Sequence, residues 1–295
     1  MYFCVQWEPD ADAGEIRQRH RSPNMFVQSK IRSVECAFAI LFVFCTNCLA
    51  ANWQSTISKE PPGNFPELRP LRATYRFGWS GLTAATGDVR FARVGDKFAF
   101  DGTGRTVGFV RALWKFDVNQ HAAADVRTLH PIELQQRENY RSKKLATQLT
   151  FTNNGVSRAR TEGDGAAAKT STKQFNFPDL FDLHSAALYL RSQPLNDRSV
   201  YRLVVYPATN AYLATLTVLG REKVSVHAGS YNAIKLDLQL KRVGKHLELE
   251  PHKKFRRATI WVSDDADRLL LRIEAQIFVG TIFADLQSVH FENAR

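Results

Sequence analysis

Short runs in which apolar and polar residues alternate, separated by turn residues, fill most of the chain after residue 70. Leu71–Trp79 and Gly87–Val94 are two such runs, and the pair Gly95-Asp96 separates the second run from Lys97–Phe100. Alternation with a period of two sends successive side chains to opposite faces, which is typical of half-buried β-strands. Gly-Asp and Asn-Gly pairs between such runs indicate tight hairpins, so neighbouring strands are expected to be antiparallel.

The same pattern predicts further strands along the chain. They are expected at residues 113–118, 132–140, 144–152, 156–160, 200–206, 211–224, 231–240, 256–262, 269–278 and 281–290. Two segments between strands are expected to lack regular structure. The glycine run Gly102–Gly108 is predicted to be a flexible connection, and the small polar segment Glu162–Lys173 a mobile loop.

One segment, after Pro178, has the spacing of a helix instead. Asp182 is expected to cap its first turn, and Pro194 stops the pattern shortly after its last turn. The apolar residues at helical spacing are expected to pack on the concave side of the sheet: Leu183, Ala186, Ala187 and Leu190.

These elements decide the fold class. A single helix among many strands excludes a doubly wound fold, which places helices between its strands. The sequence predicts a mainly β fold, either a large curved antiparallel sheet or a partly open β-barrel, with one central helix packed on its concave face. We expect one β-rich domain over residues 71–290, preceded by an extended linker at residues 51–70.

The segment before this domain resembles an export signal. The apolar run Ala37–Cys45 is much shorter than the roughly 20 residues of a membrane-spanning helix. Basic residues precede it, and the small residues of Cys48-Leu49-Ala50 follow it. We therefore predict that residues 1–50 are a non-native leader plus a signal peptide, with the true start at Met25, and that the mature protein is periplasmic. Retention as an uncleaved anchor is the alternative.

Charge and cysteine content bear on the partners. All four cysteines precede the expected cleavage site, so the mature chain would have none, which suits an oxidising compartment. The chain carries 40 Lys and Arg against 29 Asp and Glu, a net charge of +11. In an exported protein this excess favours a lipid or an anionic envelope polymer as partner, with peripheral membrane contact, over nucleic acid. Solubility alone is an equal explanation. The oligomeric state stays open.

Two groups of residues are candidate binding residues. The basic run Lys253, Lys254, Arg256 and Arg257 suits phosphate-bearing lipid, although it equally suits a solvated strand edge that prevents aggregation. His184 lies in the first turn of the predicted helix, where it would face the concave sheet. A structural histidine is the alternative there.

Catalytic, metal and cofactor sites are not indicated. The acidic segment Ser263–Arg268 lies between two apolar runs, so a hairpin tip is favoured over a hydrolytic or calcium site. The glycine run lacks the strand-to-helix context of a phosphate-binding loop. Histidines are scattered singly, without metal-ligand spacing. No cofactor is expected, and whether the protein is an enzyme is left open.

Several ordered segments resemble a known family. They are GREKV at 220–224, GSYNA at 229–233, IWVSDD at 260–265, IEA at 273–275 and GTIFADL at 280–286, together with Leu129-His130-Pro131 and the helix residues Ser185, Ala186, Tyr189 and Arg191. In these segments the chain resembles the bacterial exported family of domain of unknown function 3108. The resemblance implies an envelope protein with a β-rich fold and no established activity, and it supplies no catalytic residues.

Three classes of function follow. The first is a non-catalytic binding or carrier module for a lipophilic or anionic envelope ligand, since a curved sheet with a concave apolar face suits one. The second is a hydrolase acting on envelope glycan or lipid, with Asp264, Asp265 and Glu274 as acid and base. The third is a structural partner in envelope assembly.

Overall fold

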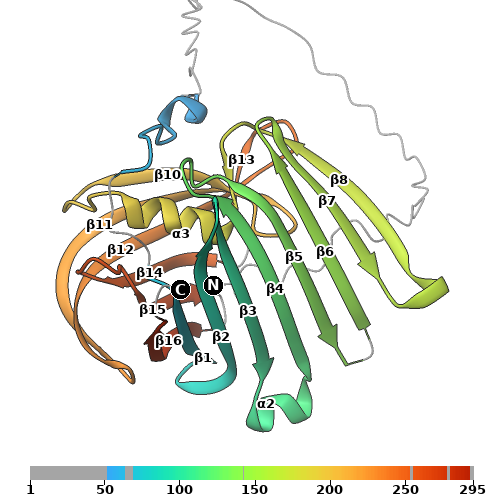
Figure 1. The fold of residues 1–295 in the computed structure, drawn as a ribbon, viewed down its shortest axis with the longest axis horizontal. Coiled ribbons are helices and arrows are strands. Elements are labelled where there is room, and N and C mark those ends of the chain that lie inside the picture. Colours follow the sequence, from blue (N-terminus) through green and yellow to red (C-terminus); the bar gives the residue numbers. More distant parts are fainter. Residues whose placement is uncertain (1–51, 64–68, 142, 253–254, 278–279, 293–295) are drawn as a thin grey trace, which may run out of the picture.

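The computed structural model describes residues 52–63, 69–141, 143–252, 255–277 and 280–292 (Figure 1). The predicted leader, signal peptide and start site lie outside these residues. The elements in chain order are the 3₁₀ helix η1 (Trp53–Thr56), β1 (Leu71–Trp79), β2 (Leu82–Val94), β3 (Lys97–Thr106), α2 (Gly108–Leu113), β4 (Phe116–Asp125), β5 (Pro131–Tyr140), β6 (Lys143–Thr152), β7 (Gly155–Glu162), the 3₁₀ turn η2 (Gly165–Ala167), β8 (Lys169–Asn176), β9 (Leu180–Phe181), α3 (Leu183–Ser192), β10 (Val200–Val205), β11 (Ala211–Val226), β12 (Gly229–Val243), β13 (Leu249–Pro251), β14 (Phe255–Ser263), β15 (Leu270–Ile277) and β16 (Gly280–Phe291).

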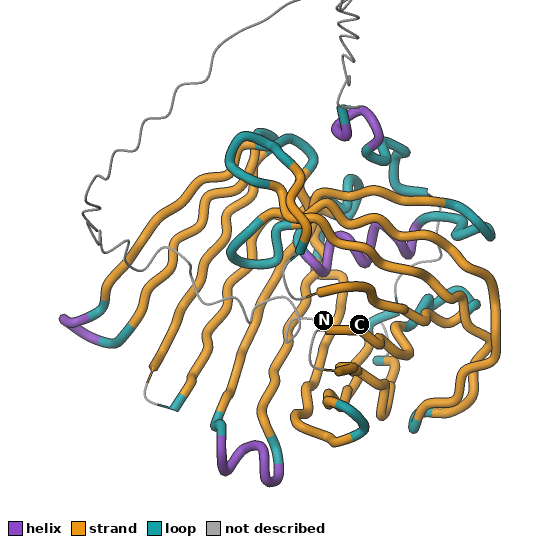
Figure 2. Tube along the Cα trace, turned by 180° about the vertical axis from the view of Figure 1, so that it is seen from behind, coloured by secondary structure: helices purple, strands orange, loops and turns teal. Residues whose placement is uncertain are grey.

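The strands form one sheet whose two halves join where the chain's first and last strands pair. The order is β8-β7-β6-β5-β4-β3-β2-β1-β16-β15-β14-β12-β11-β10-β9, with β13 added beside β12. Within the described ranges, all pairs are antiparallel except the short parallel contact of β9 with β10. The sheet curves around α3, and β3–β8 form a broad row on one side (Figures 1 and 2). The prediction of a mainly β fold with a large curved antiparallel sheet is confirmed.

Tight hairpins connect the strands as the Asn-Gly and Gly-Asp pairs predict. β6 and β7 are joined at Asn153-Asn154, and the chain enters β7 at Gly155 with φ of +146°. A Cβ atom at Gly155 would lie 2.2 Å from the carbonyl oxygen of Phe175 on β8. Only glycine leaves room for β8 to approach β7 at this point.

β10 is buried on both faces, and it separates two hydrophobic clusters of the core. Leu203 and Val205 face the cluster that includes Tyr189 of α3, whereas Val204 faces a second cluster with Leu134 of β5. Leu203 and Val204 are both fully buried. A strand covered on both sides needs a continuous apolar run, which its sequence VYRLVV largely provides.

α3 lies on the concave side of the sheet and begins with a capping box. The carboxylate of Asp182 accepts a hydrogen bond from the backbone N–H of Ser185, and the N–H of Asp182 donates to Ser185 Oγ. These bonds satisfy backbone N–H groups that have no partner inside the helix. The predictions of a helix capped by Asp182 and packed on the concave face are confirmed.

Residues 52–63, within the predicted extended linker, contain η1 and contact the domain. Trp53 Nε1–H donates to the carbonyl oxygen of Leu247 at 2.8 Å. The hydroxyl of Tyr189 on α3 donates to the carbonyl oxygen of Glu60 at 2.9 Å. The segment therefore packs along the outside of the helix and the neighbouring strands.

Three local predictions are wrong. Residues 113–118 do not form one strand, because α2 ends at Leu113 and β4 begins at Phe116. The glycine run is not a flexible connection, since Gly102 and Gly104 lie inside β3, between two paired strands. The predicted loop at 162–173 contains most of β8, an edge strand with almost every side chain exposed. Such a strand needs no apolar face, so its sequence does not alternate.

Candidate functional site

A cavity of about 400 Å³ lies between α3 and the concave face of the sheet. Its walls come from both halves of the chain, because β1–β4 supply one side and β10–β16 the other. The apolar wall residues from the sheet are Leu71, Ala73, Tyr75, Phe77, Val89, Phe91, Phe100, Val118, Leu203, Val205, Ala214, Leu216, Leu236, Leu238, Ile260, Val262, Leu270, Ile273 and Ala284, and Leu269 joins them from the loop before β15. The apolar wall residues from α3 and from the segment after it are Leu183, Ala186, Ala187, Leu188, Leu190 and Leu195.

Three glycines on β2 and β3 form part of the cavity wall and have no side chain to fill the space. Gly87 lies opposite Gly104 in the antiparallel pairing of β2 with β3, and two residues further along Gly102 lies opposite Val89. A Cβ at Gly102 would lie 2.9 Å from the ring of Phe100, and one at Gly87 would lie 2.9 Å from the carbonyl oxygen of Thr103. Glycine inside a strand costs stability and commonly marks a place where other atoms approach the backbone closely. Here the glycines widen the space in front of α3.

His184 forms part of the cavity wall at the N-terminal end of α3. Its ring stacks on Phe100, with centroids 3.5 Å apart and planes 21° apart. Its Nε2–H donates to Oε1 of Gln120 on β4 at 3.0 Å. Burial lowers the pKa of His184 to about 4, because the apolar surroundings disfavour the charged ring, and the carboxylate of Asp182 only partly opposes this. The imidazole is therefore neutral at physiological pH.

A line of polar side chains leads from His184 across the inner face of β4 and β5. The amide of Gln120 donates to Oε1 of Gln136 at 3.4 Å, and the side chain of Gln136 hydrogen-bonds Glu138. Glu138 is only 4% exposed, and burial raises its pKa to about 7 against the opposing charge of Arg160. Beyond the apolar cavity, this part of the inner face is therefore buried but polar.

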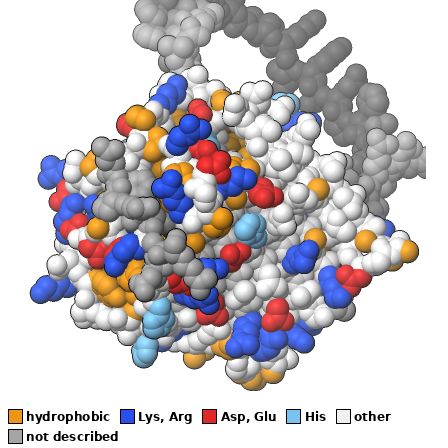
Figure 3. Space-filling model, viewed as in Figure 1, with side chains coloured by type: hydrophobic (Ala, Val, Ile, Leu, Met, Phe, Trp, Pro, Cys, Tyr) orange, Lys and Arg blue, Asp and Glu red, His pale blue; other side chains and the backbone are white. Residues whose placement is uncertain are grey.

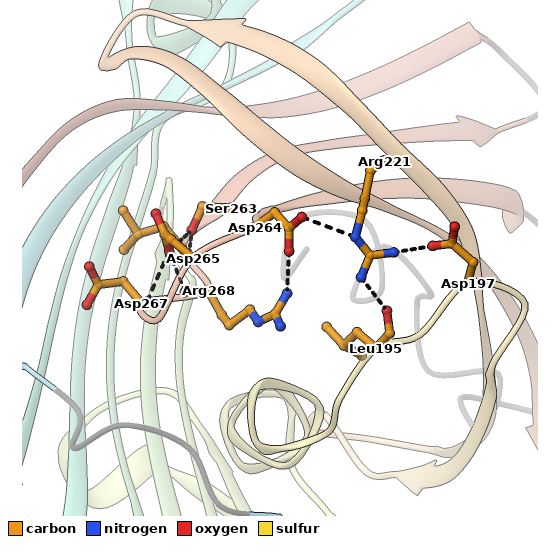
Figure 4. Close-up of polar contacts among 9 residues, drawn as sticks. Leu195, Asp197, Arg221, Ser263, Asp264, Asp265, Asp267 and Arg268 are labelled. Carbon is orange, nitrogen blue, oxygen red and sulfur yellow. Dashed lines mark hydrogen bonds and ion pairs between the residues drawn. The ribbon is translucent and has the colours of Figure 1, made fainter.

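The acidic segment forms the loop between β14 and β15, and Asp265 shapes it (Figure 4). One oxygen of Asp265 accepts from Ser263 Oγ at 2.7 Å and from the backbone N–H groups of Asp267 and Arg268 at 3.0 and 3.2 Å. Ser263 Oγ in turn accepts from the N–H of Leu269. This carboxylate holds a turn, as predicted for a hairpin tip.

The other carboxylates of this loop make ion pairs. Asp264 binds Arg268 at 3.2 Å and Arg221 of β11 at 3.1 Å, and Arg221 also binds Asp197 and the carbonyl oxygen of Leu195 (Figure 4). Asp267 pairs with Arg69. Arg221 thus ties the β14–β15 loop to the segment after α3, and Arg69 ties it to the segment before β1.

α3 also contacts this loop directly. The guanidinium of Arg191 donates to the carbonyl oxygen of Ala266 at 3.3 Å. Burial lowers the pKa of Arg191 to about 10, which leaves it charged. Arg191, Asp267 and Arg268 form a polar border to the cavity.

The candidate binding residues predicted from the sequence lie apart. His184 is on the cavity wall, whereas Arg257 is on β14 and pairs with the buried carboxylate of Asp237. Lys253 and Lys254 lie outside the described residues, and Arg256 is placed only by its backbone in β14. A binding role for each of these residues stays a prediction.

The sequence reasoning missed Gln120 and the glycines that widen the cavity. Gly87 begins one alternating run and Gly102 follows another, Lys97–Phe100, and glycine beside such runs was the available signal for a close approach of other atoms. Within the described ranges, no three His, Asp or Glu side chains are grouped as a metal site would require. No helix in the described part of the chain is both long and apolar enough to cross a bilayer.

The fold and the cavity together define a class of protein: a single open, strongly curved β-sheet that holds an apolar space against one central helix. A family model matches residues 73–287, and the chain belongs to this family, described as Protein of unknown function (DUF3108). No curated protein matches.

The fold is also similar to that of a solved structure. A β-barrel-like protein of the domain of unknown function DUF1849 from Brucella abortus is similar with a TM-score of 0.54 and 10% identity, over 77% of this chain and 99% of that one. This likeness shows the fold. A candidate exported protein with a YmcC-like fold from Bacteroides fragilis has a TM-score of 0.30 and 12% identity, over 77% and 98% of the two chains. A score of 0.30 carries no argument for this chain.

Proposed function

We propose that the protein is a non-catalytic binding or carrier module that holds the apolar part of a lipophilic ligand between α3 and the sheet. The observation that carries this proposal is the cavity of about 400 Å³ with its apolar walls. That volume falls within the roughly 300–1,000 Å³ of ligand pockets. Water gains few hydrogen bonds in such a space, so an apolar chain that replaces it is favoured.

Polar groups at the cavity border suit the head of an amphiphilic ligand. Gln120 and His184 stand at one place on the wall, and Arg191 and Arg268 at another. A few fixed polar groups around an apolar space are the usual means by which binding sites orient a ligand. We include an anionic head among the candidates, although Asp264 and Asp267 already neutralise part of the arginine charge.

Binding is favoured over hydrolysis by what the carboxylates of the acidic loop already do. Asp265 holds the backbone of its turn and Asp264 bridges two arginines. An acid and base pair needs proton-accepting groups aimed at a substrate. Glu274, the third carboxylate considered, is half-exposed on β15, 3.9 Å from Arg272.

The location that we propose is the periplasm, after cleavage of the signal peptide at Ala50. The support is the order of basic, apolar and small residues before Asn52. N-terminal sequencing of the protein from the periplasmic fraction tests this location. A start at Ala51 is expected, and a mature protein that retained residues 37–45 would contradict it.

Native mass spectrometry of freshly purified protein tests the binding function. We expect co-purifying lipid on the wild type and its loss in Ala187→Trp, because Ala187 faces the cavity from an exposed helix position. Ala146→Trp is the matched control, since Ala146 is exposed on β6 and is not part of the cavity wall. Equal lipid content in the two variants would contradict the proposed site.

A further inference from the structure

Four large apolar side chains are exposed at one end of the sheet. Trp79 and Leu82 flank the turn between β1 and β2, and they are 46% and 68% exposed. Phe109 and Leu113 are on α2, between β3 and β4, and they are 77% and 56% exposed. We refer to these four residues as the apolar tip.

The two parts of the apolar tip are neighbours. The N–H of Val107, just before α2, donates to the carbonyl oxygen of Ala84 on β2 at 2.9 Å. Ala85 and Thr106 are register partners on β2 and β3. Phe109 and Leu113 are four residues apart and share one side of α2. Both connections protrude at the same edge of the sheet (Figures 1 and 2).

α2 is held in place without the help of its apolar side chains. None of its residues is buried. Arg111 fixes it instead, through two hydrogen bonds to the carboxylate of Asp117 at 2.9 and 3.1 Å and a contact of 3.3 Å with the carbonyl oxygen of Thr106. Phe109 and Leu113 therefore point toward solvent, and their side chains do not belong to the hydrophobic core.

Cations surround the apolar tip. Arg105 is near the end of β3, Arg111 is on α2, and Lys115 and Arg141 adjoin β4 and β5, while the carboxylate of Asp117 pairs with Arg111. These four cations and one carboxylate sum to +3. Hydrogen bonds from Arg111 lower the pKa of Asp117, and the charges of Lys115 and Arg105 add to this effect. The space-filling view shows Lys and Arg side chains gathered at this end of the sheet, with hydrophobic side chains beside them (Figure 3).

We propose that the apolar tip docks on an anionic lipid membrane surface. Protruding Trp, Phe and Leu side chains enter the interface between headgroups and acyl chains, and flanking Lys and Arg side chains pair with anionic headgroups. The four side chains project from two separate turns, which suits a fluid surface better than the flat packed core of a protein interface. The charge of +3 selects an anionic surface.

Docking at this end would place the bilayer beside the cavity. Gly104 and Val118 belong to the cavity wall, and each is two residues from the end of its strand at α2, Thr106 and Phe116. A ligand bound as proposed above would therefore lie a short distance from the membrane. The docking surface itself does not depend on that ligand.

Hydrogen–deuterium exchange of the full chain with vesicles tests the proposal locally. Vesicles of phosphatidylcholine alone are compared with vesicles that also contain phosphatidylglycerol. We expect slower exchange at residues 79–85 and 105–116 with the anionic vesicles only. Exchange at these residues that is the same with and without anionic vesicles would overturn the proposal, and the apolar tip would then be assigned to a protein partner.

Vesicle co-sedimentation of variants tests the residues. The double variant Phe109→Ser/Leu113→Ser and the single variant Lys115→Glu should each lower the partition coefficient at least about tenfold. Val94→Ser and Lys97→Glu are the matched controls, because Val94 is 63% exposed, Lys97 is exposed, and the two residues are register partners at the opposite end of β2 and β3. Equal partition of the tip variants and the controls would contradict the assignment.

The two proposals fail separately. Ala187→Trp fills the cavity and should leave vesicle binding unchanged, whereas Phe109→Ser/Leu113→Ser should leave co-purifying lipid unchanged. Circular dichroism of each variant establishes that it is folded before either comparison is made.

Discussion

The imidazole of His184 lies flat on the ring of Phe100, 3.5 Å from it between centroids, and donates its Nε2 proton to Gln120. Neither contact supplies a negative charge to the ring, which forms part of the wall of an apolar cavity. Protonation would place a cation there without water around it. The relationship therefore makes the protein sensitive to acid.

The first prediction is that His184 makes unfolding easier as the pH falls from about 6.5 to about 4. Burial depresses the folded pKa to about 4, below the usual 6.5. Between these values the unfolded chain binds a proton that the folded chain does not, so the free energy of unfolding falls with pH. His184→Gln should remove up to about 3 kcal/mol of this dependence. Urea unfolding at several pH values measures it, and an unchanged slope in the variant would refute the assignment.

The second prediction concerns Glu138 and has the opposite sign. Burial raises its folded pKa to about 7, above the usual 4.5. The folded chain then holds a proton that the unfolded chain releases, so the stability present below about pH 4.5 is lost as the pH rises through 7. Glu138→Gln should be more stable than the wild type at pH 8 and nearly equal to it at pH 4. Glu133→Gln on the same strand is the control, and equal behaviour of the two variants would count against the prediction.

The strands could be predicted because most of them are half-buried, so their sequences alternate. β11 and β12 extend only a few residues beyond the predicted ranges. β8 escaped prediction because an edge strand with both faces exposed has no reason to alternate. α2 escaped because six residues with no buried face show no helical period.

The cavity could be predicted in outline only. A concave apolar face with a helix on it follows from the strand pattern, but the identity of its walls depends on the pairing of β1 with β16. That pairing joins residues more than 200 positions apart, such as Leu71 and Phe291, and no local pattern encodes it. Gln136 and Glu138 alternate with exposed residues and are polar, so a sequence pattern assigns them to solvent although they are buried.

The third prediction separates turn geometry from charge at Asp265. Its Oδ1 accepts from Ser263 Oγ and two backbone N–H groups, and an asparagine oxygen accepts in the same place. Asp265→Asn should change the free energy of unfolding by less than about 0.5 kcal/mol, and Asp265→Ala should lower it by about 1–3 kcal/mol. Denaturant unfolding of both variants measures this. A well-folded Asp265→Asn protein that lost its cellular function would favour the hydrolase reading instead.

The last prediction distinguishes two leucines of α3 by their burial. Leu188 is 4% exposed and packs in a cluster with Phe98 and Leu129, whereas Leu190 is only half-buried, although both contribute to the cavity wall. Leu188→Asp buries a charge without a partner and should cost at least about 3 kcal/mol. Leu190→Asp leaves the carboxylate in a space that water can enter, so it should cost clearly less, but it should abolish the binding of an apolar ligand.

Thermal unfolding and binding of a fluorescent fatty acid give the two readouts for these variants. Leu188→Ala and Leu190→Ala are the size controls, since they shorten the side chain without adding charge. If Leu190→Asp unfolded as easily as Leu188→Asp, packed side chains would fill this space in solution and no ligand could enter it. If Leu190→Asp kept full fatty-acid binding, the ligand would bind elsewhere, and the assignment of the cavity would be wrong.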